Sequence, residues 1–64
     1  MKLVIVDSDG NEHRGVLVSK DSSFLFMKMD GSEEIKVWSW DALPEGSLFR
    51  VTPNGRTPVN MRME

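Results

Sequence analysis

Hydrophobic and polar residues alternate along this chain in short runs, and turn residues separate the runs. Such runs are typical of β-strands, and no stretch with helical periodicity is long enough to predict a helix of ten or more residues. The pattern predicts five strands, at residues 2–7, 12–20, 24–29, 33–41 and 47–52. Asp9-Gly10 and Asp30-Gly31 predict hairpin turns, because a type I′ turn needs positive φ at both central residues. We therefore expect an all-β protein.

The second and third predicted strands shape the expected sheet. Gly15 lies inside the second strand, where a lone glycine marks a bulge, a sharp bend or a close approach of two backbones. The third strand has two largely apolar faces, formed by Leu25, Met27 and Met29 on one side and by Phe24, Phe26 and Lys28 on the other. Either one face contacts another subunit, which we favour, or the bent sheet folds over and covers both faces.

The end of the chain is less regular. Residues 42–47 interrupt the strand pattern with Pro44 and Gly46 and predict a loop or one short 3₁₀ turn. Residues 53–64 are expected to be a C-terminal loop followed by an extended tail, or by a weak sixth strand over residues 59–64 that pairs through Asn54-Gly55. The predicted domain is therefore a small barrel over residues 1–52, with residues 53–64 appended.

Composition narrows the choice of function. The chain has 64 residues, no cysteine and one histidine, so disulfides and thiolate metal sites are excluded and no cofactor is expected. Small domains need other means of stabilisation, which leaves oligomerisation by elimination. The net charge is −2 and no basic run is present, so a general electrostatic grip on nucleic acid is not expected. No signal peptide or membrane span is predicted, and we expect a soluble cytoplasmic protein.

Four positions within residues 6–29 resemble the first motif of the Sm, LSm and Hfq superfamily. The motif has an apolar strand, a turn ending in glycine, a second glycine five residues later, then a leucine and an acidic residue. The matching residues are Gly10, Gly15, Leu17 and Asp21. The resemblance covers roughly residues 3 to 52.

The resemblance implies a strongly bent, five-stranded SH3-like barrel, here without the N-terminal helix usual in the family. Such subunits form homo-oligomeric rings of about five to about eight copies, in which the fifth strand of one subunit pairs with the fourth of the next. Pairing in this way would satisfy two exposed sheet edges. Family rings commonly bind single-stranded RNA near the central pore, as RNA chaperones or post-transcriptional regulators.

The family pattern is incomplete at its RNA-contacting positions. The position that stacks a base is Ser23, which has no ring, and the position of the base-reading asparagine in Sm and LSm proteins is Leu25, a departure that Hfq proteins share. The second family motif aligns near Trp38-Ser39-Trp40, which matches neither the Sm nor the Hfq pattern. The candidate RNA-binding residues are Ser23, Phe24, Trp38, Ser39 and Trp40.

Each candidate residue also has a structural interpretation. Trp38 and Trp40 share a strand face if the fourth strand extends that far, where they would form a stacking platform; alternatively one fills the interior or a subunit seam. For Asp21 we expect a carboxylate that holds the backbone of its turn, and for His13 a solvated or hydrogen-bonded side chain. No pair of residues has catalytic spacing, so an enzyme is not expected. The alternative to RNA binding is a ring-forming structural or protein-interaction module without RNA.

Overall fold

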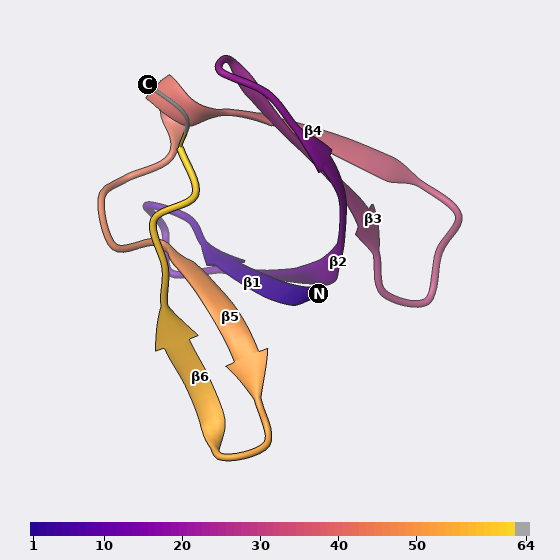
Figure 1. The fold of residues 1–64 in the computed structure, drawn as a ribbon, viewed down its shortest axis with the longest axis vertical. Helices are drawn as coiled ribbons and strands as arrows, with labels where there is room; N and C mark the ends of the chain where they lie inside the picture. The colour runs from indigo at the N-terminus through magenta and orange to yellow at the C-terminus, as the bar shows by residue number, and fades with distance from the viewer. Residues whose placement is uncertain (63–64) are drawn as a thin grey trace.

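The computed structural model describes residues 1–62 as one antiparallel sheet with a single turn of 3₁₀ helix (Figure 1). Its elements are β1 (Lys2–Val6), β2 (Glu12–Lys20), β3 (Phe24–Met29), β4 (Ile35–Ser39), η1 (Trp40–Ala42), β5 (Leu48–Thr52) and β6 (Gly55–Pro58). The all-β prediction is confirmed. Within these residues, no helix has the length and apolar character needed to cross a membrane.

The six strands lie in the order β4-β3-β2-β1-β5-β6. The sheet is not closed, since β4 pairs only with β3 and β6 pairs only with β5. These two strands are therefore its free edges. In Figure 1, the β5–β6 hairpin and the β3–β4 hairpin extend from opposite sides of the central β1–β2 pair.

β2 links the two halves of the sheet by bending. Its first half pairs with β1 and its second half with β3, and the register shifts between Leu17 and Ser19. Gly15 lies where the two pairings overlap, opposite Leu3 on one side and Met29 on the other. A Cβ at Gly15 would lie 2.3 Å from the Lys28 carbonyl oxygen, so the two backbones approach closely, which is one of the three features that a lone strand glycine predicts.

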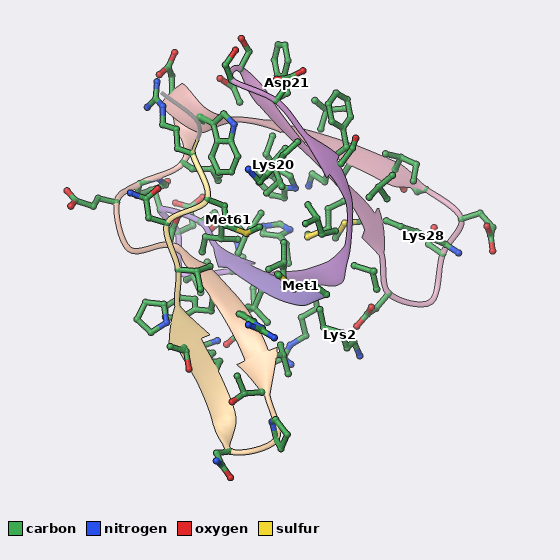
Figure 2. The ribbon with its side chains drawn as sticks, viewed as in Figure 1. Met1, Lys2, Lys20, Asp21, Lys28 and Met61 are labelled. Atoms are coloured by element: carbon green, nitrogen blue, oxygen red, sulfur yellow. The ribbon has the colours of Figure 1, made fainter. Side chains whose placement is uncertain are left out.

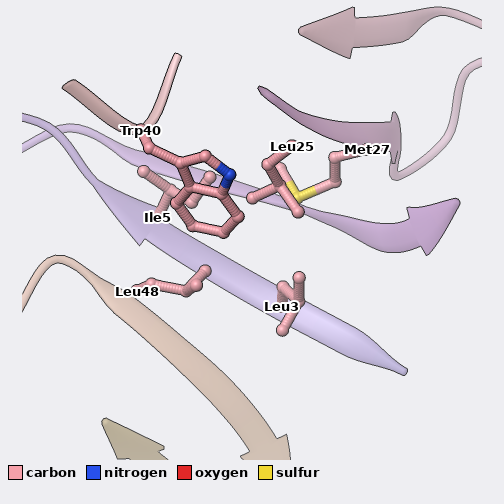
Figure 3. Close-up of a cluster of buried hydrophobic side chains, with 6 residues drawn as sticks. All are labelled: Leu3, Ile5, Leu25, Met27, Trp40 and Leu48. Atoms are coloured by element: carbon pink, nitrogen blue, oxygen red, sulfur yellow. The ribbon is translucent and has the colours of Figure 1, made fainter. Parts of the chain in front are cut away.

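The core lies on the concave side of this bend (Figure 3). It consists of buried side chains from β1, β3, η1 and β5, namely Leu3, Ile5, Leu25, Met27, Trp40 and Leu48. Val4 is also buried, although it points to the opposite face of β1, so β1 is covered on both sides as its β-branched run predicted.

The two Asp-Gly turns have a different geometry from the one predicted. Among the residues of these two turns, only Gly10 and Gly31 have positive φ, so neither turn is type I′. At the first turn the Gly10 amide donates to the Asp7 carbonyl, and the Asp7 carboxylate accepts the amides of Asp9 and Asn11. The two hydrogen bonds from backbone amides to the Asp7 carboxylate hold the turn, so Asp9 does not adopt the strained positive φ that a type I′ turn would require there.

The C-terminal boundaries also differ from the prediction. β4 ends at Ser39 instead of continuing to residue 41, because Trp40 begins η1. The sixth strand exists, but at Gly55–Pro58 instead of residues 59–64; Met63 and Glu64 lie outside the described residues.

After β6 the chain turns back over the core. The Val59 amide donates to the Leu48 carbonyl, and Val59 and Met61 pack against the core, with Met61 on the concave side in Figure 2. The segment after residue 52 therefore contributes both a strand and core contacts.

Candidate interaction surface

The structure brings the five predicted site residues together where β3 begins and β4 ends. Phe24 pairs with Ser39, and Trp38 lies opposite Leu25. The Trp40 amide donates to the Ser23 carbonyl at 3.2 Å. Their side chains, however, point to different sides of the sheet, so they do not form one surface.

Trp40 belongs to the core. Its side chain is buried, and its Nε1 donates to the Asp21 carbonyl at 2.8 Å. The expectation that Trp38 and Trp40 share a strand face is wrong, because β4 ends between them. A base cannot stack on the Trp40 ring without opening the core.

Trp38 is half-buried at the edge of the concave side. The His13 ring meets it edge-on with centroids 4.9 Å apart, and the Lys36 ammonium lies 4.6 Å from the centre of its ring. His13 is in turn hydrogen-bonded to Asp7, with 2.8 Å between Nε2 and Oδ2. This bond, together with the Asn11 amide, holds the pKa of Asp7 below its usual value. Two side chains of the same chain, His13 and Lys36, are therefore in contact with the Trp38 ring.

Asp21 organises the turn between β2 and β3, whose tip is labelled in Figure 2. Its Oδ1 accepts the backbone amides of Ser23 and Phe24 at 2.8 and 2.7 Å. These bonds, the one from Phe24 first, lower the pKa of the Asp21 carboxyl. The backbone-holding role expected from the sequence is confirmed.

The convex side of β2, β3 and β4 carries an apolar surface, which we call the outer face. It consists of Val16, Val18, Phe24, Phe26, Ile35 and Val37. All but the half-buried Phe26 are exposed, with Phe24 at 42% and Val37 at 51%. Phe24 and Phe26 meet edge-on, and Phe26 lies opposite Val37 in the register.

The exposure of the outer face tests the expectation that the bent sheet covers both apolar faces of the third strand. The interpretation in which the bent sheet covers both faces is wrong for the described residues, because Phe24 stays exposed. Sequence reasoning gave Ile35 and Val37 no site role. The sequence feature that could have identified them is their i, i+2 spacing around Lys36, which places both side chains on one face of a strand.

Most cations are already paired with acids of the same chain. Five of the eight Lys and Arg residues form ion pairs within residues 1–62, namely Lys2, Arg14, Lys28, Arg56 and Arg62. The Arg14 guanidinium also lowers the pKa of Glu12. Little unpaired positive charge is left for phosphate groups.

A shallow groove of about 540 Å³ lies between the loop after η1 and residues 58–62. The buried Ser47 hydroxyl, which has no hydrogen-bond partner among residues 1–62, belongs to its lining. Within the described part of the chain, no group of three His, Cys, Asp or Glu residues is placed to hold a metal ion.

Comparisons with protein-family models, with curated proteins and with solved structures found no match to this chain. The Sm-type resemblance therefore stays a prediction from the sequence.

Proposed function

We propose that this protein is a protein-interaction module, which works by docking its outer face onto another protein chain. The observation that carries the proposal is the exposure of five neighbouring hydrophobic side chains on one side of the sheet. Soluble monomers rarely expose large contiguous apolar patches, and such patches mark interaction sites. The two rings of Phe24 and Phe26 supply the aromatic contact area that interfaces favour.

We further propose that the fold is a variant of the Sm-type, SH3-like barrel. The bend at Gly15 and the free edge at β4 support this assignment. β6 is the element that departs from a five-stranded Sm-type barrel, because it pairs with β5 on the side away from β1. A ring built through β5 of one subunit and β4 of the next would require β6 to detach, so the proposed docking does not use that contact.

Single-stranded RNA is the second candidate partner, and the exposed ring of Phe24 favours it. Base stacking on an aromatic side chain contributes about 1–3 kcal/mol per base. We rank RNA second for two reasons: five of the eight cations are paired internally, and Trp40 is part of the core.

Photo-cross-linking distinguishes the two partners. A benzophenone amino acid is placed at Phe24, and for the matched control at Thr57, which is exposed on β6 away from the outer face. After irradiation in cells, the proposal predicts adducts at position 24 that ribonuclease leaves intact, with far fewer at position 57. Ribonuclease-sensitive adducts would favour RNA, and equal yields at both positions would contradict a docking face.

Binding to U-rich and A-rich oligonucleotides gives an independent measurement. The interaction module predicts no change in solution mass when the oligonucleotide is added. RNA binding predicts a mass increase whose affinity falls with salt, with a slope that reports the phosphates neutralised.

A further inference from the structure

β4 is an edge strand, and within residues 1–62 no strand pairs with its outward side. The Met29 amide donates to the Glu34 carbonyl, and the Trp40 amide donates to the Ser23 carbonyl. Backbone groups alternate sides along a strand, so the even-numbered residues of β4 bond to β3. The amides and carbonyls of Ile35, Val37 and Ser39 therefore face away from β3, along the free edge.

The other edge is less suited to pairing. β6 has four residues, and one of them is Pro58, which has no amide to donate. β4 has five residues without proline, and it borders the outer face through Ile35 and Val37. An exposed edge of this kind is a template for a further strand.

We infer that the partner of this free edge is a second copy of the chain, paired antiparallel along β4 with Val37 opposite Val37 of the other copy. This inference goes beyond the proposed function, because pairing along the edge of β4 sets the two outer faces side by side and leaves Phe24 of each copy exposed for docking. In a two-fold pair, opposite residues lie on the same face, so an odd residue faces an odd one and an even residue an even one. This rule restricts the register to a few choices.

The positive charge of Lys36 excludes one of these registers. Centring the pair on Lys36 would place two ammonium groups opposite each other, which is destabilising. Centring it on Val37 places Lys36 opposite Trp38 of the second copy, and each Lys36 already packs against a tryptophan ring in its own chain. The Val37 register also pairs Ile35 with Ser39 at both ends, so all three outward-facing residues of each copy are hydrogen-bonded.

The flanking groups are compatible with this arrangement. In this register Glu33 comes opposite Asp41 of the second copy, beyond the ends of β4, and each carboxylate is paired within its own chain, with Lys28 and Arg62 respectively. On the convex side, Val37 lies opposite Phe26 within its own sheet. The pairing would therefore join the two outer faces into one continuous apolar surface.

Single cysteines test the register, because the chain has no cysteine of its own. Cα atoms of directly opposite residues in such a pair are about 5.5 Å apart, within the reach of a disulfide. Two copies of residue 35 would instead lie about 13 Å apart along the strands, which is too far. We expect Val37→Cys to form a covalent dimer about tenfold faster than Ile35→Cys, or than Thr57→Cys on the other edge.

Hydrogen exchange of the unmodified protein gives a second readout that needs no variant. In concentrated solution, the amides of Ile35, Val37 and Ser39 should become protected and lose that protection on dilution. The amides of Lys36 and Trp38, which face β3, should be protected at both concentrations. A contact between two outer faces without strand pairing would leave the first group unprotected.

Two results would overturn the inference: equal oxidation rates for the three cysteine variants, or no concentration-dependent protection at residues 35, 37 and 39. Neither result affects the proposed function, because strand pairing along β4 does not cover position 24 and protein adducts can form there in either case. Loss of those adducts would remove the proposed function and leave the strand pairing standing.

Discussion

Gly15→Ala tests the close approach on which the bend of β2 depends. An alanine Cβ would lie 2.3 Å from the Lys28 carbonyl oxygen and 2.8 Å from Met27 Cγ. Met27 is buried, and the carbonyl belongs to the β3 backbone, so neither group can rotate away. The two strands must separate by roughly 1 Å to reach ordinary contact, which weakens their pairing and the packing beneath it.

The expected loss can be worked from these contacts. Overpacking a core costs about 1–3 kcal/mol, and a clash with backbone belongs at the upper end. Alanine also restricts the unfolded chain, which stabilises the folded protein by about 0.4–1 kcal/mol and offsets part of this cost. The net loss is therefore about 2 kcal/mol, against a total stability of about 3–10 kcal/mol for a chain of this size. The melting temperature should fall by about 8–16 °C.

Urea denaturation followed by tryptophan fluorescence measures this loss. Gly31→Ala is the matched control, because it requires positive φ but meets no atom within 4 Å. Strain alone should cost that variant about 1 kcal/mol. If Gly15→Ala were within about 0.5 kcal/mol of the original protein, the close approach of β2 to β3 would be refuted.

Three further predictions concern the core and the turns. Leu25→Ala should lower the free energy of unfolding by about 2–5 kcal/mol, whereas Phe24→Ala, one residue away on the outer face, should lower it by less than about 1 kcal/mol; equal losses in urea denaturation would contradict the assignment of the two faces. Trp40→Phe should cost about 1–3 kcal/mol, because it leaves the Asp21 carbonyl without its donor in a partly buried position; an unchanged urea midpoint would contradict that hydrogen bond. Stability should fall as the pH drops below the ordinary aspartate pKa of 3.8 and through the lower folded-state pKa values of Asp7 and Asp21, since the unfolded chain binds those protons more readily. The double variant Asp7→Asn and Asp21→Asn should therefore show a flatter dependence of the urea midpoint on pH between neutral and acid; an equally steep dependence would contradict those hydrogen bonds.

Much of the fold could be predicted because its signals are local. Short apolar runs bounded by turn residues located the first three strands to within about a residue, and Gly15 marked the bend. The carboxylate of Asp21 was expected to hold its turn, and two amide bonds do so. The turn conformations were wrong where a neighbouring side chain intervened, as the Asp7 carboxylate does at the first turn.

The candidate site was harder to predict, because it depends on where each strand ends. Trp38 and Trp40 have the spacing of one strand face, but η1 begins between them and turns Trp40 into the core. The energetic reason is that a large ring buried with its Nε1 bonded stabilises a small core more than one left in solvent. The homo-oligomeric ring of subunits expected from the Sm-type resemblance stays a prediction.

The sequence by itself determined the all-β class, the bend and the two apolar faces of the third strand, since each depends on residues near in the chain. The tertiary structure decided which face is covered, because only the meeting of β1, β3, η1 and β5 forms the core on the concave side. It also decided the free edges: β6 occupies the second edge of β5 and leaves β4 open. Strand order joins residues far apart in sequence, and no local pattern encodes which backbone groups remain unpaired.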